Sequence, residues 1–260
     1  SGIKGYNVTV TNGAQSGLAS MAYAMSVLRS GQENAMLATG SDENSDIMTE
    51  LFDKLGVTSE KVVAPFAGND GFVLSDGSAS VLIEDEKSAK ERGARIYCHA
   101  SGYGMAHSNV KFGTLTGSEA GLTNAVNNAL ADAGITIDDI DAVFGFANGM
   151  KAVDDVEIKG LTAVFGDKLA EKPVVELKEV LGESRAAAAT TAAAHAALMF
   201  AGKIPSQDAY SIAADGSVSK TKAEASKLNN VLVAAYGAGV HTQQSYSASN
   251  EAGQMPMTKN

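Results

Sequence analysis

Apolar and polar positions along this chain alternate between the short period of strands and the longer period of helices. Residues 6–11 place an apolar residue at every second position, which predicts a strand, and residues 16–29 carry apolar side chains at helical spacing before Gly31. The other predicted strands are 34–40, two short strands within 72–84 around a turn at 75–77, 94–101, 142–147, 173–177, 232–236 and 243–247. The other predicted helices are 46–55, 86–92, 117–133, 156–164 and 184–200. Strands that alternate with helices predict an α/β fold with a mainly parallel sheet covered on both faces.

The composition fits a globular protein and excludes several function classes. The chain has 260 residues, of which 45% are hydrophobic, so it can bury a substantial core. It has no run of about 18 apolar residues and no basic-then-apolar start, so neither a transmembrane helix nor a signal peptide is expected. The single cysteine, Cys98, excludes an internal disulfide and favours a reducing cytoplasm. A net charge of −10 argues against nucleic acid, and the four histidines do not have metal-ligand spacing.

Three stretches of the chain have a distinctive order and spacing. Residues 11–18, Thr-Asn-Gly-Ala-Gln-Ser-Gly-Leu, close the first predicted strand and open the first predicted helix. Residues 69–84 have the sequence Asn-Asp-Gly-Phe-Val-Leu-Ser-Asp-Gly-Ser-Ala-Ser-Val-Leu-Ile-Glu, and residues 89–97 the sequence Ala-Lys-Glu-Arg-Gly-Ala-Arg-Ile-Tyr. Together these stretches resemble the β-ketoacyl synthases, the condensing enzymes of fatty acid and polyketide assembly. The resemblance implies an α/β, thiolase-like layered fold (αβαβα) with two βαβ-type halves.

The positions that hold catalytic groups in that family hold other residues here. In the family, a cysteine at the helix N-terminus attacks an acyl thioester, and the matching residue of this chain is Ala14. The two family histidines that assist decarboxylation match Phe146 and Glu183. Phenylalanine transfers no proton, and a carboxylate would repel a developing enolate. The vestigial positions Ala14, Phe146 and Glu183 therefore imply a chain without catalytic residues.

Framework residues of the family persist where the catalytic groups do not. They are Lys178, the pair Asp154 and Glu157, and the Gly-rich stretch that begins at Tyr236. This pattern resembles the chain length factor, or ketosynthase β-subunit, of type II polyketide synthases and related polyene pathways. The resemblance implies a heterodimer, or a dimer of heterodimers, with an active ketosynthase, whose two subunits enclose the tunnel for the growing chain. It implies no cofactor here, because the phosphopantetheine of an acyl carrier protein holds the substrate, and that acidic carrier docks chiefly on the other subunit.

The same resemblance implies a set of site residues. The pocket or tunnel candidates are Gln15, Lys178, Tyr236 and His241, and the strand that pairs across the dimer interface carries Tyr6, Val8 and Val10. Family members often carry glutamine at the nucleophile position. Gln15 lies one place later, so either the loop shifts by one residue or this feature is absent. Lys178 is expected to pair with a carboxylate such as Glu183.

Two other functions stay open on the sequence alone. One is a malonyl-carrier decarboxylase that uses the Gln15 amide in place of cysteine, and the other is a purely structural stabiliser of the active ketosynthase. Plainer interpretations also apply to single residues. Cys98 in a strand, His195 on an alanine-rich helix and His241 after a Gly-rich loop are each more typical of packing than of chemistry. Asp154 and Glu157 are expected to hold a loop.

The start of the chain bears on its domain organisation. The predicted strand-to-helix turn at residues 11–18 lies about a dozen residues from Ser1, whereas a full family member has several strands and helices before this turn. Residues 1–260 therefore match one ketosynthase domain fragment, in which about 1–100 complete the N-terminal half and about 101–260 form the C-terminal half. We expect the upstream segment to exist as a separate chain, produced by cleavage of a longer precursor. That segment is expected to remain packed against this chain. The Ser1 hydroxyl permits self-cleavage by an N→O acyl shift; ordinary proteolysis or a cloning remnant are the alternatives.

Overall fold

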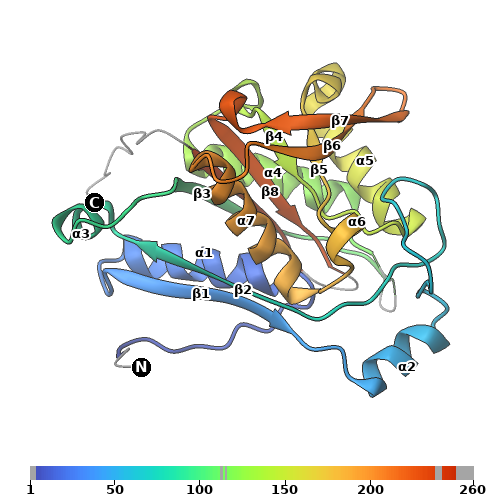
Figure 1. Cartoon of the computed structure of the whole chain (residues 1–260), viewed down its shortest axis with the longest axis horizontal. Helices are drawn as coiled ribbons and strands as arrows, with labels where there is room; N and C mark the ends of the chain where they lie inside the picture. The colour runs from blue at the N-terminus through green and yellow to red at the C-terminus, as the bar shows by residue number, and fades with distance from the viewer. Residues whose placement is uncertain (1–3, 112–113, 115, 238–241, 250–260) are drawn as a thin grey trace.

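The described part of the chain folds around a larger and a smaller β-sheet (Figure 1). The computed structural model describes residues 4–111, 114, 116–237 and 242–249. The described strands are β1 (Ala35–Asp42), β2 (Gly77–Glu84), β3 (His99–His107), β4 (Ala142–Phe144), β5 (Val174–Val175), β6 (Ser206–Ile212), β7 (Val218–Glu224), β8 (Asn230–Ala235) and β9 (Thr242–Ser249). The described helices are α1 (Ser16–Arg29), α2 (Asp46–Lys54), α3 (Glu86–Glu91), α4 (Glu119–Ala133), α5 (Lys151–Phe165), α6 (Lys178–Leu181) and α7 (Ala186–Phe200). Short 3₁₀ turns lie at Ile137–Asp139, Gly166–Glu171 and Ala225–Lys227.

Both sheets are mixed or antiparallel rather than mainly parallel. The larger sheet has the described strand order β3-β9-β8-β4-β5-β6-β7, and β1 pairs with β2 in the smaller sheet. Among the described pairs, β4–β5 and β4–β8 are parallel and the others are antiparallel. The prediction of a mainly parallel sheet is therefore wrong. Its cause is that β6–β7 and β8–β9 are joined by short connections, which return the chain antiparallel to itself.

The layers follow the predicted thiolase-like order. Helices α1 and α7 pack against each other between the two sheets, while α4 and α5 cover the opposite face of the larger sheet (Figure 1). The middle layer is tight, because a Cβ atom on Gly17 or Gly40 would collide with Ala186 and Thr190 of α7. On the outer face of the smaller sheet, Leu37 and Leu82 pair across the strands and are each 54% exposed. The described residues thus form four of the five layers of an αβαβα fold.

Several predicted elements of the first half need correction. Residues 6–11, with Tyr6, Val8 and Val10, are extended, but no described strand pairs with them, and a strand exists only with a hydrogen-bonded neighbour. Within residues 72–84 the structure has one strand, β2, instead of two, while Phe72 and Leu74 make isolated bridges to Thr58 and Glu183. The strand predicted at 34–40 is found as β1, in which exposed side chains alternate with buried or half-buried ones.

The second half shows shifts and one addition. β3 begins at His99 instead of residue 94, because Gly102 and Gly104 let it lie against the α4 backbone and hide its strand pattern. Helix α5 begins five residues before the predicted position of 156, at Lys151. The hairpin of β6 and β7 was not predicted. Its second strand, Val-Ser-Lys-Thr-Lys-Ala-Glu, is mostly exposed at the sheet edge and lacks apolar alternation.

Candidate functional site

The turn into α1 is held by local hydrogen bonds. Gly13 has φ +62°, a left-handed conformation that glycine adopts without strain. Asn12 N donates to Ser16 Oγ at 2.8 Å, and Ser16 N donates to Gly13 O at 3.1 Å. Ala14 therefore lies one residue before the N-cap Gln15, close to the first turn of α1, whose free N–H groups and dipole favour negative charge. This position would activate a nucleophile, and alanine supplies none.

Ala14 lies on the wall of a cavity of about 1030 Å³. Phe146, which follows β4, and Glu183, which follows α6, line the same cavity. Three positions separated by up to 169 residues in sequence thus meet around one space, where the resemblance expects a nucleophile and two histidines. The other predicted site residues on its wall are Tyr236, Tyr6, Val8 and Val10.

Glu183 is held by three hydrogen-bond donors. Its Oε2 accepts from Lys178 Nζ at 2.8 Å and from Asn148 Nδ2 at 2.9 Å, and its Oε1 accepts from Arg185 N at 2.9 Å. Lys178 and Glu183 are both buried, so the predicted ion pair is present. Both carboxylate oxygens therefore accept hydrogen bonds from groups of the protein.

Phe146 packs over the same lysine. Lys178 Nζ lies 3.0 Å from the centre of the Phe146 ring and donates to Phe146 O at 3.0 Å. The ring also packs edge-on against Tyr236, with 5.5 Å between ring centroids. The ammonium group is thereby enclosed by an aromatic face, a carbonyl and a carboxylate. Phe146 takes the place of a proton-transferring group and is itself part of a packed cluster.

Buried carboxyl groups lie behind this cluster. Glu157 accepts from Phe146 N at 2.9 Å, and Asp154 accepts from Asn148 N at 3.0 Å, so the pair on α5 holds the loop after β4 as predicted. Burial raises the pKa of both acids. Burial, together with the neighbouring Glu157, raises the pKa of Glu176 well above its ordinary value. Burial and the nearby Glu157 carboxyl group therefore favour the protonated form of Glu176.

Arg185 is a cavity-lining residue that the sequence did not single out. It has φ +46°, an unfavourable backbone conformation for arginine, directly before α7. Its Nη2 forms a partly buried ion pair with Asp42 and donates to Glu43 O at 2.9 Å. Burial and this pairing tie the N-terminus of α7 to the end of β1. Glu176 was also missed, although a carboxylate inside the apolar strand predicted at 173–177 is a signal of a buried titratable group.

Two tunnel candidates lie elsewhere. Gln15 is fully buried and its side chain packs against Gly237, so it is not among the residues that line the cavity. Gln15 is the N-cap residue of α1, whereas Ala14, one residue earlier, lines the cavity. Lys178 is also absent from the cavity wall, because Phe146 and Glu183 lie between the lysine side chain and the cavity. His241 lies outside the described residues.

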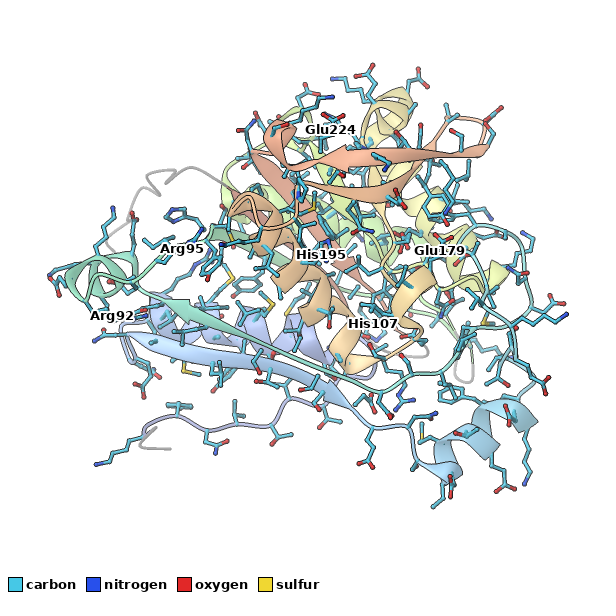
Figure 2. All side chains as sticks on the ribbon, viewed as in Figure 1. Arg92, Arg95, His107, Glu179, His195 and Glu224 are labelled. Carbon is cyan, nitrogen blue, oxygen red and sulfur yellow. The ribbon has the colours of Figure 1, made fainter. Side chains whose placement is uncertain are left out.

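Cys98 and His195 are placed as packing residues. Burial raises the pKa of the Cys98 thiol to about 11, which makes it a poor nucleophile. His195 lies on α7 in the interior (Figure 2), with its ring centroid 6.0 Å from that of Phe144. Burial lowers the pKa of His195, so the ring is neutral. Neither residue lines the cavity.

The three central positions of the site carry neither a thiol nor an imidazole. Ala14 has no nucleophilic atom, and the Phe146 ring has no proton that it can transfer. Both oxygens of Glu183 accept hydrogen bonds within the protein. Within the described residues, no group of three or more metal-binding side chains gathers. No helix in the described ranges is long and apolar enough to cross a bilayer. The arrangement offers a cavity of about 1030 Å³ with a partly apolar wall.

Two family models match most of the chain. The model described as "Beta-ketoacyl synthase, N-terminal domain" matches residues 1–89. The model described as "Beta-ketoacyl synthase, C-terminal domain" matches residues 97–211. The two models occur in the order of the two halves, and both vestigial histidine positions fall within the second match.

Curated relatives include condensing enzymes of two pathways. The chain is 27% identical over 194 residues to the "3-oxoacyl-[acyl-carrier-protein] synthase 2" of Coxiella burnetii, with 72% of this chain and 47% of the relative covered. It is 27% identical over 191 residues to the "Tetracenomycin polyketide synthase ketoacyl synthase alpha subunit" of Streptomyces glaucescens, with 70% and 45% covered. The chain therefore spans about half the length of these relatives.

Solved structures share the fold. "The ishigamide ketosynthase/chain length factor" superposes with a TM-score of 0.83 at 26% identity, covering 94% of this chain and 61% of that chain. A type II polyketide synthase acyl-carrier protein in complex with its ketosynthase bound to the hexaketide gives a TM-score of 0.79 at 20% identity, covering 93% and 62%. The thiolase-like ketosynthase fold predicted from the sequence is thereby confirmed, with this chain as a fragment of it.

Proposed function

Because the chain belongs to the β-ketoacyl synthase family, we propose that it is a non-catalytic subunit that pairs with an active ketosynthase. In that pair it shapes the tunnel that limits the length of a polyketide or polyene chain. One observation carries the proposal: Ala14, Phe146 and Glu183 line a single cavity of about 1030 Å³ and none can perform a step of condensation. The space of an active site is kept while its chemistry is replaced by packing.

Two of the residues at the replaced catalytic positions contact a common lysine. This favours a protein that has become non-catalytic at several positions over one that has lost a single catalytic group. Phe146 covers Lys178, and Lys178 neutralises Glu183. Reverting one residue would leave the other two in place, so a lone substitution could not restore the reaction. A non-catalytic role explains why the scaffold around these residues remains packed.

The partners follow from the same family. We propose that the growing chain is held on the phosphopantetheine of an acyl carrier protein and that this subunit needs no cofactor. The net charge of −10 disfavours docking of an acidic carrier on this chain, so the carrier would bind chiefly to the active ketosynthase. A reducing cytoplasm remains the expected compartment, and cleavage from a longer precursor remains a prediction.

The two alternative functions have less support. A decarboxylase that uses Gln15 needs its amide in the substrate space, but Gln15 packs against Gly237 behind the wall. A pure stabiliser needs no cavity. We therefore place tunnel shaping first and let the experiment separate all three.

The test is reconstitution with the active ketosynthase and its carrier protein. Ala14→Leu narrows the cavity and should shorten the product, while Met36→Ala, also on the wall, should lengthen it. Met105→Ala, an exposed methionine outside the cavity, is the matched control. Unchanged products from both wall variants in an intact complex would overturn tunnel shaping in favour of a stabiliser. Acetyl-carrier product from radiolabelled malonyl carrier, with the partner's cysteine removed, would support the decarboxylase.

A further inference from the structure

Arg185 combines several unfavourable features on the wall of the cavity. Its φ of +46° lies in the left-handed region, which is strained for a residue with a side chain. The residue is only 8% exposed although it carries a full charge. Its Nη1 atom is buried and has no hydrogen-bond partner among the described residues. A residue held in such a state beside a cavity is a candidate for ligand recognition.

The guanidinium group of Arg185 is anchored through Nη2. This nitrogen pairs with Asp42 and donates to Glu43 O at 2.9 Å. The backbone N–H of Arg185 donates to Glu183 Oε1 at 2.9 Å. These contacts hold the side chain beside the last residue of β1. Because both described contacts of the guanidinium group are made by Nη2, the N–H groups of Nη1 can turn toward the cavity while Nη2 keeps its partners.

The charges around Arg185 determine which acceptor fits there. Asp42, Glu183 and Asp76 are the carboxylates that act on the guanidinium group. Lys178 is paired with Glu183, so two cations meet three carboxylates and the excess charge is negative. A carboxylate or phosphate that entered here would be repelled. A neutral carbonyl oxygen would accept an N–H hydrogen bond without adding charge.

Apolar side chains contribute to the wall at the same end of β1. The strand ends at Asp42, and the helix that follows it, α2, contributes Met48 and Phe52 to the wall. Phe52 packs edge-on against Phe72, another lining residue, with 5.6 Å between the ring centroids. An acyl chain at this end would place its alkyl carbons against these side chains. One polar donor in an apolar wall is the usual means by which a pocket selects an oxygen-bearing ligand.

We propose that Arg185 is a specificity-determining residue of this cavity and recognises a neutral keto oxygen of the growing chain through the N–H groups of Nη1. The cavity then favours a chain that retains a ketone over a fully reduced chain of the same length, and it rejects a chain that carries a carboxylate. The inference rests on the proposed function, because the occupant is the chain that the tunnel holds. It deepens that proposal, since the subunit selects a chain by its oxygen atoms as well as by its length.

A purely structural role for Arg185 is the alternative. In that role the residue only holds the end of β1 against the start of α7, through its ion pair with Asp42. Such a role needs a positive charge at position 185 but no second nitrogen. Lysine supplies the charge without the second nitrogen, so Arg185→Lys separates recognition from anchoring.

The test is the binding of thioester probes of equal carbon number to this chain in complex with the active ketosynthase. The probes are the β-ketohexanoyl, hexanoyl and adipoyl thioesters of N-acetylcysteamine. The reactive cysteine of the partner is replaced by alanine, so that no probe is transferred to it. Titration calorimetry should give a dissociation constant for the β-keto probe at least about tenfold below that of the hexanoyl probe. The adipoyl probe carries a carboxylate and should bind most weakly.

Matched variants assign these preferences to single residues. Arg185→Lys should reduce the preference for the β-keto probe to less than about threefold, whereas Arg95→Lys, at an exposed site outside the cavity, should leave it unchanged. Asp42→Asn removes a carboxylate and should tighten binding of the adipoyl probe at least about threefold. Asp46→Asn, at an exposed site outside the cavity, is the control for that change.

Infrared spectroscopy of a probe with an isotopically labelled ketone adds a readout on the unchanged chain. A ketone that accepts a hydrogen bond from a guanidinium group absorbs at lower wavenumber than a ketone in an apolar wall. The band of the bound probe should therefore shift down, and the shift should be lost in Arg185→Lys. An unshifted band would overturn the proposal. Equal affinity for the β-keto and hexanoyl probes, or a preference that persists in Arg185→Lys, would do the same.

The outcomes also separate this inference from the proposed function. A ketone preference that depends on Arg185, without any change of product length in Ala14→Leu and Met36→Ala, would contradict tunnel shaping alone. Changed product lengths in those two variants, without a ketone preference, would contradict the role of Arg185 alone.

Discussion

Lys178 Nζ lies 2.8 Å from Glu183 Oε2, and both side chains are only 6% exposed. By the resemblance to the β-ketoacyl synthases, Glu183 matches a position that holds a histidine in that family. Asn148 Nδ2 and the backbone N–H of Arg185 also donate to this carboxylate, so both of its oxygens accept hydrogen bonds within the protein. The negative charge of Glu183, which would repel an enolate, is instead paired with the positive charge of Lys178.

Breaking this pair from one side should destabilise the protein strongly. Lys178→Met leaves the Glu183 charge buried, and a buried ion pair that loses one partner costs about 3–5 kcal/mol of unfolding free energy. Lys178→Met combined with Glu183→Gln removes both charges and should recover more than half of that loss. Urea unfolding of the purified protein measures the effect.

The control for the ion pair is a surface pair with the same chemistry. Lys151 and Asp155 lie 2.6 Å apart but are 60% and 40% exposed. Lys151→Met should change stability by less than about 1 kcal/mol. Equal effects of the two lysine variants would contradict the role given to the buried pair.

Glu176 should make stability fall as pH rises. Its folded pKa is raised by burial and by Glu157, so its contribution to stability is complete below the unfolded pKa of about 4.5 and is lost as pH rises toward the folded pKa. One such proton contributes a slope of up to about 1.4 kcal/mol per pH unit. Glu176→Gln cannot titrate, so its unfolding free energy should vary less with pH from 5 upward. Glu171→Gln, at an exposed site, should keep the slope of the unchanged protein.

A cysteine at the vestigial nucleophile position should be reactive but not catalytic. Ala14→Cys places a thiol on the cavity wall before α1, where the helix dipole lowers a thiol pKa. The pKa of Cys98 is about 11, so at pH 8 iodoacetamide should label the new thiol on the order of 10²-fold faster. Mass spectrometry reads the labelling, and Cys98→Ala in the same background is the control.

No condensation product should accompany that labelling. Phe146 cannot transfer a proton and Glu183 is held by Lys178, so an acylated Ala14→Cys protein should stall. The assay supplies acyl and malonyl carrier proteins to the variant in complex with a partner that lacks its own cysteine. Product formation would show that the three positions do not act together.

Elements whose ends are marked by a nearby glycine could be predicted from the sequence. The bounds of α1 agree, because Gly31 follows it directly, and α2 agrees to within one residue, because Gly56 ends its pattern. β3 was displaced, since its strand identity depends on two glycines fitting against α4, a tertiary contact that no local pattern reports. Residues 6–11 have a strand pattern, but pairing requires a neighbour that the described chain does not contain.

The site divides in a similar way. Ala14, Phe146 and Glu183 could be named because motifs fix their positions relative to the family. Arg185 could not, because its partner Asp42 is 143 residues away and its φ of +46° follows from packing. Gln15 shows the same limit: its neighbour in sequence lines the cavity, while its own side chain points to Gly237.

The contact between α1 and α7 yields a final prediction. A Cβ atom on Gly17 would collide with Thr190 Oγ1, and Gly17→Ala should cost about 1–3 kcal/mol of unfolding free energy. Thr190 Oγ1 is buried and has no hydrogen-bond partner among the described residues, so Thr190→Ala alone should be nearly neutral. The double variant should be more stable than Gly17→Ala by at least about 0.5 kcal/mol, a coupling expected only for residues in contact. Thr162→Ala, which removes another buried unpaired hydroxyl on α5, should add to Gly17→Ala without coupling. Strict additivity with Thr190→Ala would show that the two helices do not meet at these residues.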